Sequence, residues 1–390
     1  MKELWLVAKA DKRVRLGHNW IFSNEVDQSH TALASFAPGE LARVVDNGRN
    51  PVGLAYVNPN ALICARILTR DVRASIDASW FANRIRRALE LRERLFAAPY
   101  YRLLYGESDG VPGIVVDRYG GVCVVQLNTA GAMTLREPFI AALTETIAPK
   151  GVLLRNAGSM RALEGIEALD QSLGDVPERI DVVEGDMRIA APLRTGQKTG
   201  YFFDQRDNRA RLRRYVKPGD RVLDVFSYVG AWAISALHAG AQSVTCIDQS
   251  ELALDYADES ARAIGKEVNG LVGDALEVMQ GLAKEKRRYD VVILDPPALI
   301  KRRKDATAGE RHYARLHDAA LRLLREDGFL ITASCSYHLA TERLQRIALD
   351  AARTAGRRLQ VLEHHGQAPD HPVHPAMPET EYLKALFLRA

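Results

Sequence analysis

Residues 1–72 carry short runs in which apolar and polar residues alternate. Examples are LARVVD, PVGLAYV and LICARIL, and Pro-Gly, Asn-Gly and Asn-Pro pairs separate such runs. Alternation with a period of two between turn-forming residues is typical of half-buried strands. The pattern therefore predicts a small, mostly β domain over 1–72.

Residues 73–190 show a mixed pattern. The segment ASWFANRIRRALELRERLF has apolar residues at helical spacing and an arginine-rich opposite face. The strand-like runs GIVVDRY and VCVVQL follow, joined by a Gly-Gly turn, and a helix is expected at about 134–148. We predict a small α+β central domain over 73–190.

Strand-like and helix-like segments alternate over 191–390. The strand-like runs are RVLDVF, SVTCID, NGLVGD, YDVVILD and FLITASC. Helix-like segments lie between them at about 231–239, 251–264, 275–285 and 309–325. Strands this apolar, joined by helical crossovers, predict an α/β fold with a mainly parallel, Rossmann-like sheet covered on both faces. Such sheets bind ligands beyond the carboxyl ends of their strands.

The first turn of this sheet lacks the glycine patterns that bind phosphates. It consists of Phe226, Ser227, Tyr228, Val229 and Gly230. A dinucleotide site needs G-x-G-x-x-G here, and a P-loop needs G-x-x-x-x-G-K-[ST]. The sequence therefore favours a nucleoside cofactor without a diphosphate, contacted by this turn.

Acidic residues mark the next strand ends. Asp248 is placed to accept hydrogen bonds from ribose hydroxyls and Asp274 to face an adenine amino group, with Asp224 near the first strand end. A single acid at such a place more often caps the following helix. Three successive acids reverse that preference, and their order resembles the class I methyltransferase motif series. S-adenosylmethionine is the expected cofactor, with S-adenosylhomocysteine as product.

Asp295, Pro296 and Pro297 follow the fourth strand. Asp-Pro-Pro at this place is similar to the motif of enzymes that methylate nucleobases or amino groups, although it also serves as a simple strand terminator. Proline rings fix φ and remove backbone donors, which gives a rigid wall for a planar base. We expect Pro296 and Pro297 to contact substrate, and Asp295 to contact both cofactor and base.

Cys335 stands at the carboxyl end of the fifth strand, between two serines. Neighbouring strands lie about 4.8 Å apart, so Asp295 and Cys335 should emerge side by side. A thiolate added to C6 of cytosine makes C5 reactive toward a methyl group, and Asp295 at N3 supports the developing charge. The prediction is a Cys335 nucleophile with a catalytic Asp295, acting on an unstacked RNA base.

Composition agrees with a globular protein. The 390 residues are 47% hydrophobic and 26% charged, with a net charge of +4. The four cysteines lie far apart, which argues against a zinc site or a disulfide scaffold, and Cys64, Cys123 and Cys246 are expected to be buried. No metal is expected, and neither a signal peptide nor a membrane segment is predicted, because the apolar stretch 225–247 divides into strand, turn, helix and strand. The expected location is the cytoplasm.

The sequence resembles the RlmI-type large-subunit ribosomal RNA cytosine-5 methyltransferases over nearly its whole length. The segments that carry the resemblance are GHNWIFSNEV (17–26), GESDGVPGIVVDRYG (106–120), GQKTGYFFDQRDNR (196–209), FSYVGAW (226–232), LDPPALI (294–300) and SCSYH (334–338). The resemblance implies a PUA-type RNA-binding module at the start, a class I methyltransferase domain at the end, and the family nucleophile at Cys335. It also implies that Tyr201, Gln205 and Arg206 contact the cofactor, and it leaves a homodimer open.

The chain departs from this family at two positions. Ala298 stands where a lysine is common, and His317 where an asparagine often lies. The second cysteine that many RNA cytosine-5 enzymes carry after the motif-four proline is also absent. The base that removes the C5 proton therefore has no candidate in the sequence.

Two basic clusters suggest contacts with ribosomal RNA. One comprises Arg206, Arg209, Arg211, Arg213 and Arg214, and the other comprises Lys301, Arg302, Arg303 and Lys304. A charge run is usually a solvated face, and for the first cluster the two interpretations balance. The second cluster follows the Asp-Pro-Pro motif directly, which favours phosphate contacts.

Other functions stay open on the sequence. An amino-group methyltransferase acting on an RNA purine would use the Asp-Pro-Pro motif without Cys335. A non-catalytic RNA-binding assembly factor would keep the cofactor pocket alone. A dehydrogenase ranks last because the glycine fingerprint is missing.

Overall fold

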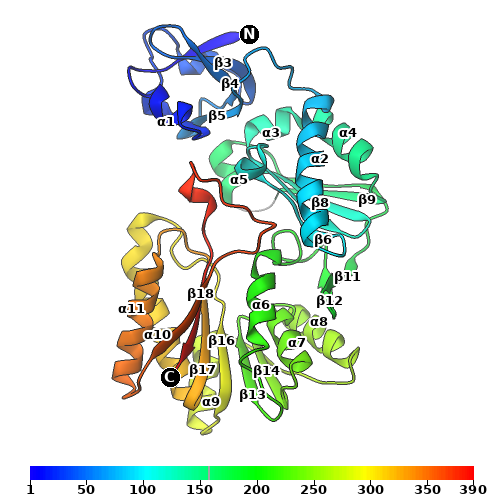
Figure 1. Ribbon diagram of the computed structural model, residues 1–390, viewed down its shortest axis with the longest axis vertical. Helices are drawn as coiled ribbons and strands as arrows, with labels where there is room; N and C mark the ends of the chain where they lie inside the picture. The colour runs from blue at the N-terminus through cyan, green and yellow to red at the C-terminus, as the bar shows by residue number, and fades with distance from the viewer. Residues whose placement is uncertain (157–158) are drawn as a thin grey trace. The chain divides into compact units, whose positions relative to one another are not determined.

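The computed structural model describes residues 1–156 and 159–390. They form two compact units, each described here by itself (Figure 1). The first unit comprises Met1–Glu178, Leu193–Tyr201 and Pro369–Thr380, and the second comprises Arg179–Pro192, Phe202–Ala368 and Glu381–Ala390. The chain thus passes between the units several times, and the predicted domain boundaries at 72 and 190 stay predictions.

The first unit begins with a five-stranded sheet in the order β1-β3-β4-β5-β2. Its strands are β1 (Lys2–Trp5), β2 (Trp20–Phe22), β3 (Glu40–Val45), β4 (Pro51–Val57) and β5 (Ile63–Thr69), with the short helix α1 (Asp11–Arg15) between β1 and β2. Strand residues such as Leu4, Val44 and Ile67 are buried in its own core. This confirms the β-rich fold predicted from the alternating pattern.

A second sheet of the same unit has the order β10-β9-β8-β7-β6. Its strands are β6 (Tyr100–Tyr105), β7 (Ile114–Tyr119), β8 (Val122–Leu127), β9 (Gly151–Asn156) and β10 (Leu169–Gly174). The helices of this region are α2 (Ala78–Leu95), α3 (Ala130–Thr134), α4 (Arg136–Ile147) and α5 (Ser159–Glu164). Helices α2 and α4 pack together through Phe81 and Phe139. The two rings meet edge to face, with their centroids 5.4 Å apart.

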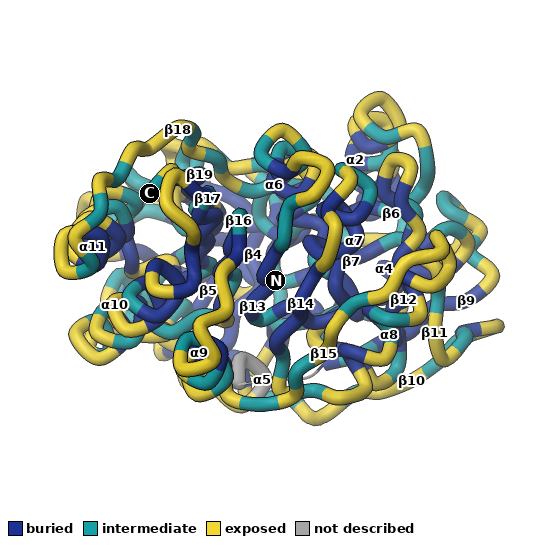
Figure 2. Tube along the Cα trace, turned by 90° about the horizontal axis from the view of Figure 1, so that it is seen from below, coloured by how far each residue is buried: buried dark blue, intermediate teal, exposed yellow. Residues whose placement is uncertain are grey.

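The second unit is built on a seven-stranded sheet in the order β15-β14-β13-β16-β17-β19-β18. Its strands are β13 (Arg221–Val225), β14 (Ser243–Asp248), β15 (Asn269–Val272), β16 (Tyr289–Leu294), β17 (Leu324–Ser334), β18 (Gln360–His365) and β19 (Lys384–Arg389). The first five are parallel, as predicted, and β19 runs antiparallel to β17 and β18. Figure 2 shows β13, β14, β16 and β17 as buried, while β18 at the edge is largely exposed.

Helices cover both faces of this sheet. They are α6 (Arg206–Leu212), α7 (Ala231–His238), α8 (Glu251–Arg262), α9 (Ala275–Lys284), α10 (Ala306–Leu323) and α11 (Thr341–Thr354). Leu223 and Val225 of β13 pack into the core formed with α9, α10 and α11. Asp224, between them, accepts a hydrogen bond from Ala233 N–H of α7. Because successive strand residues point to opposite faces, these two groups of helices lie on opposite sides. A hairpin, β11 (Arg179–Glu184) and β12 (Met187–Pro192), packs on α7 and α8.

The helices anticipated from hydrophobic spacing are present, with their ends shifted by at most three residues. The parallel sheet and the class I arrangement confirm the predicted fold class. The antiparallel pair β18–β19 was not anticipated. No helix in the described part of the chain is long and apolar enough to cross a bilayer.

Candidate active site

The loop after β13 has an unusual backbone. Phe226 and Tyr228 have φ values of 66° and 48°, in the left-handed region that large side chains rarely adopt. The N–H groups of Phe226 and Ser227 donate to Ile247 O at 2.9 and 3.1 Å, and Tyr228 N–H donates to Asp248 Oδ2 at 2.9 Å. Strained residues persist when their surroundings hold them. The end of β14 therefore fixes this loop at the carboxyl edge of the sheet.

Gly230 closes the same loop and is the N-cap residue of α7. Its φ is 72°, and a Cβ atom there would lie 2.6 Å from Cβ of Ala257 in α8. Only glycine meets both conditions without strain. The residue is thus required for the close packing of α7 on α8, whether or not it also faces a cofactor.

Asp248 and Asp274 both accept backbone hydrogen bonds. Asp248 is half-buried and accepts from Tyr228 through Oδ2 and from Ser250 through Oδ1, both at 2.9 Å. Asp274 is exposed, and its Oδ1 caps α9 by accepting from Leu276 and Glu277 at 3.0 and 3.2 Å. Each carboxylate oxygen has two lone pairs, so Asp248 retains capacity for hydroxyl donors. The remaining acceptor capacity of Asp248 therefore fits ribose hydroxyls, whereas Asp274 performs the capping role that was the alternative interpretation.

Asp224 is a fully buried acid beside this loop. Its Oδ2 accepts from Ala233 N–H at 3.1 Å, and its Oδ1 has no hydrogen-bond partner among the described residues. Burial, together with the neighbouring Asp295 carboxylate, raises the pKa of Asp224 to about 8. The group is therefore largely protonated at neutral pH.

Asp295 follows β16 directly and is half-buried. Gln205 Nε2 lies 3.0 Å from both carboxylate oxygens, and Trp232 Nε1 donates to Oδ2 at 3.0 Å. Burial raises the pKa of Asp295 to about 6, against the lowering effect of these donors. The carboxylate is therefore mostly ionised at neutral pH and held in one orientation.

Gln205 is itself oriented by Asn208, whose Nδ2 donates to its Oε1 at 2.7 Å. The amide of Gln205 donates to Asp295 and accepts from Asn208. Its contact with the cofactor stays a prediction. Trp232 was missed as a functional residue, although the segment FSYVGAW contains it. An indole has one N–H donor. Its acceptor, Asp295, lies 63 positions away in the sequence, so no local spacing indicates the pair.

Cys335 lies just past the end of β17. Strands β16 and β17 are hydrogen-bonded neighbours, with Leu294 opposite Thr332, so Asp295 and Cys335 emerge from adjacent strands at the same edge. Cys335 is half-buried, whereas the other three cysteines are buried. Burial raises the pKa of Cys64 and Cys123 to about 12 and that of Cys246 well above its ordinary value. Accessibility therefore separates Cys335 from its three counterparts.

Hydroxyl groups hold the turn that carries Cys335. Tyr313 of α10 hydrogen-bonds Ser334 Oγ at 2.8 Å and Ser336 Oγ at 3.3 Å. Ser336 Oγ also accepts from Ile300 N–H at 3.1 Å. The loop after Pro297 and the helix α10 therefore fix the backbone on both sides of the cysteine.

His317, one turn along α10, is buried, and burial lowers its pKa to about 4.

Two other predicted cofactor contacts, Tyr201 and Arg206, precede β13 in the chain. Tyr201 is buried in the first unit, at the point where the chain leaves it. Arg206 lies 3.7 Å from Glu184 Oε2, with its guanidinium carbon 5.3 Å from the centre of the Phe203 ring. Their contacts with a cofactor stay predictions.

The two basic clusters differ. In the first, Arg209 is buried against Glu184, Arg213 pairs with Asp186, and Arg211 lies 3.4 Å from Glu363. These pairings favour the structural interpretation of that run. In the second, all four residues 301–304 are exposed, and Arg302 pairs with Asp305 at 3.0 Å. Pro296 is buried and Pro297 is exposed beside them.

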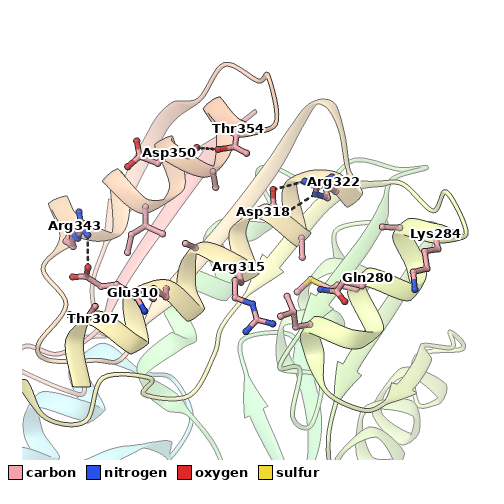
Figure 3. A pocket seen from close by; sticks show the side chains of 18 residues that line it. Gln280, Lys284, Thr307, Glu310, Arg315, Asp318, Arg322, Arg343, Asp350 and Thr354 are labelled. Carbon is pink, nitrogen blue, oxygen red and sulfur yellow. Dashed lines mark hydrogen bonds and ion pairs between the residues drawn. The ribbon is translucent and has the colours of Figure 1, made fainter. Parts of the chain in front are cut away.

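A groove of about 1030 Å³ lies between α9, α10 and α11 (Figure 3). Its rim carries the ion pair of Arg343 with Glu310 at 2.6 Å and that of Arg322 with Asp318 at 3.0 Å. None of the strand-end residues described above lines it. Among the described residues, no group of three or more His, Cys, Asp or Glu side chains is arranged to hold a metal ion.

These features define a class of protein. A family model described as S-adenosylmethionine-dependent methyltransferase matches residues 160–389, and one described as PUA-like domain matches residues 4–70. Over the full length of both chains, the fold is similar to a SAM-dependent methyltransferase structure from Streptococcus mutans, with a TM-score of 0.84 at 18% identity. A further structure, complexed with SAH, has a TM-score of 0.85 at 18% identity and the same complete coverage. The class is that of the S-adenosylmethionine-dependent methyltransferases.

Relatives of known name are similar over almost the whole chain. Ribosomal RNA large subunit methyltransferase I of Erwinia tasmaniensis is 36% identical, covering 99% of this chain and 98% of the relative. The proteins of the same name from Klebsiella pneumoniae and Escherichia coli O157:H7 are each 35% identical at 99% and 98% coverage. The chain belongs to the ribosomal RNA large subunit methyltransferase I family.

Proposed function

We propose that this protein methylates C5 of a cytosine in large-subunit ribosomal RNA, with Cys335 as the nucleophile. The observation that carries the proposal is the emergence of a half-buried cysteine and an oriented carboxylate from the adjacent strands β16 and β17. The relatives named for large-subunit ribosomal RNA support the substrate class. This substrate would place the protein in the cytoplasm.

The cofactor side of the site is formed by the loop 226–230 and Asp248. Asp248 would accept hydrogen bonds from ribose hydroxyls, because each of its oxygens is used once by backbone. The fixed loop would shape the wall of the pocket. S-adenosylmethionine, when bound, supplies an electrophilic methyl group.

On the substrate side, the target base would be unstacked and would lie against Pro296 and Pro297. The Cys335 thiolate would add to C6, forming an S–C6 bond and moving the electron pair of the C5=C6 bond onto C5 and into the conjugated C4–N3 unit. The protonated form of Asp295 would give its proton to N3 as negative charge develops there, and the resulting carboxylate would accept a hydrogen bond from N3–H. This makes C5 nucleophilic toward the methyl group. N3 returns its proton when the product leaves.

Release restores the aromatic ring. The C5 proton leaves to a base, its electron pair re-forms the C5=C6 bond, and the S–C6 bond breaks to return the thiolate.

The exposed residues 301–304 would contact phosphates flanking the target. An RNA contact of this kind provides affinity that depends on salt and not on sequence.

A covalent adduct tests the chemistry. RNA in which the target cytosine carries fluorine at C5 cannot lose a C5 proton, so the full-length protein should stay bonded to it, and peptide mass spectrometry should find the RNA on Cys335. Cys335→Ala should give no adduct, whereas the matched control Cys64→Ala should react like the wild type, because Cys64 is buried in the first unit.

Nucleoside mass spectrometry of ribosomal RNA from cells with and without the gene identifies the product. Loss of one 5-methylcytidine supports the proposal. Loss of a methylated purine, with activity retained in Cys335→Ala, would establish an amino-group methyltransferase. Binding of cofactor and RNA without any change in methylation would establish an assembly factor.

A further inference from the structure

Lys384 places a positive charge next to the turn that carries Cys335. It is the first residue of β19 and lies opposite Ser334 in the antiparallel pairing of β19 with β17. Its Nζ donates to Ser336 O at 2.7 Å and to Tyr382 O at 2.8 Å. The backbone of Lys384 therefore lies opposite Ser334, and its side chain reaches the carbonyl of Ser336, on the other side of Cys335.

These two hydrogen bonds fix the ammonium group without neutralising it. A lysine ammonium has three donors, so two backbone carbonyls leave one donor for a further partner. Both carbonyl acceptors are neutral, and the positive charge stays available to a nearby anion. Lysine at this place is half-buried, which strengthens such an interaction relative to one in open water.

The charged and titratable groups around the cysteine come from four elements. Asp295 after β16 and Glu381 before β19 carry carboxyl groups, and burial raises the pKa of Tyr313 in α10 above its ordinary value. Tyr337 and His338 follow on the same turn and are exposed. Burial lowers the pKa of Lys384, while a charged Cys335 and Glu381 act to raise it. The thiolate and this ammonium group therefore stabilise one another.

We propose that the Lys384 ammonium group stabilises the thiolate form of Cys335 and so keeps the nucleophile ready at neutral pH. An ordinary thiol, with a pKa near 8.5, is ionised only to a few per cent at neutral pH. A positive charge within about 4–6 Å of a titratable group favours its anion. Lys384 acts through Cys335 and not on the substrate, so it is a positioning residue. The inference rests on the proposed role of Cys335.

The rate at which iodoacetamide alkylates Cys335 measures its ionisation directly, with the full-length protein and without RNA. The rate is followed by peptide mass spectrometry between pH 5 and pH 10, and Cys335→Ala gives the background. In Lys384→Met the midpoint of this profile should move up by about one pH unit, which is about tenfold less thiolate at neutral pH. Lys384→Arg should restore the midpoint to within a few tenths of a unit.

Lys384→Gln separates charge from hydrogen bonding. Glutamine keeps an N–H donor for the Ser336 carbonyl but carries no charge, so its midpoint should match that of Lys384→Met. A wild-type midpoint in Lys384→Gln overturns the proposal, and so does a wild-type midpoint in Lys384→Met. If Lys384→Met fails to fold, the comparison of the glutamine and arginine variants decides the question.

The fluorocytosine adduct tests Cys335 itself and is independent of this measurement. An adduct on Cys335 together with an unmoved midpoint rejects the role of Lys384 alone. A midpoint that moves without any adduct rejects the proposed chemistry and leaves Lys384 as an electrostatic partner of a thiolate.

Discussion

The two halves of the sheet's carboxyl edge hold their polar side chains in different ways. On the β14–β15 side, Asp248 and Asp274 accept hydrogen bonds from backbone N–H groups, mostly two or three residues further along the chain. On the β16–β17 side, side chains hold Asp295, and one of them, Gln205, lies 90 positions away. Tyr313 and Lys384 likewise contact the turn of Cys335 from other elements.

This difference separates binding from chemistry. A carboxylate held by backbone N–H groups needs only the sheet's edge and the start of its own helix, and it can serve a cofactor wherever the sheet forms. A carboxylate held by a glutamine and an indole is fixed more narrowly, because several side chains restrict it at once. We infer that the first half mainly binds and the second half mainly reacts.

The largest expected effect comes from Asp295→Asn. Removal of a charge that supports the transition state should lower kcat about 1000-fold, with the cofactor Kd changed by less than about threefold because the amide keeps one acceptor. Methyl transfer to RNA at saturating cofactor and calorimetric cofactor binding measure the two quantities.

The matched variant on the other side is Asp248→Asn. Loss of a charge-assisted hydrogen bond to ribose should weaken cofactor binding by about 10- to 100-fold, with kcat at saturating cofactor nearly unchanged. A collapse of kcat in Asp248→Asn, with normal cofactor affinity, would remove the distinction between the halves.

A smaller effect is expected from the exposed basic residues 301–304, which follow the Asp-Pro-Pro motif in the chain. Changing Lys301, Arg302, Arg303 and Lys304 together to glutamine should weaken RNA binding about 100-fold at low salt and reduce the slope of log Kd against log salt by about 3. Cofactor affinity should stay unchanged. The control is Arg213→Gln with Arg214→Gln, which should change the slope by less than about 1, since these arginines lie near Asp186 and Glu363. Equal slopes in the two variants would contradict the assignment.

The smallest expected effect concerns Asp224, which lies between the two halves. Its pKa is raised to about 8 in the folded protein, so the folded state holds a proton that the unfolded state has released above its ordinary pKa. The stability that this proton provides is present at low pH and is lost as the pH rises toward 8, at about 1.4 kcal/mol per pH unit. Asp224→Asn should remove this dependence.

Urea unfolding at pH 6 and pH 8 measures the difference. The wild type should lose about 2 kcal/mol more unfolding free energy than Asp224→Asn over this interval. Asp295 titrates at or below the lower limit, since its pKa is raised only to about 6. Parallel losses in the two proteins would show that Asp224 is ionised in the fold.

Much of the site could be located from the sequence. The strand ends at Asp248, Asp295 and Cys335 follow from apolar runs of strand length, because burial on both faces requires such runs. Parallel strands bring their carboxyl ends to one edge, so the positions of these residues follow once the strands are known. The alternative roles of acids at these ends, capping or binding, could not be separated in this way, and Asp274 caps α9.

The sequence by itself determined the alternation of strands and helices from β13 to β17, the β-rich start and the residues that reach the sheet's edge, because each depends on local periodicity and turn chemistry. Only the tertiary structure decided that Gln205 and Trp232 hold Asp295, that β19 enters the sheet antiparallel beside β17, and that Lys384 thereby reaches the turn of Cys335. Contacts of this kind join residues separated by tens of positions. Their spacing carries no periodic signal, and they exist only once packing has brought the separate elements together.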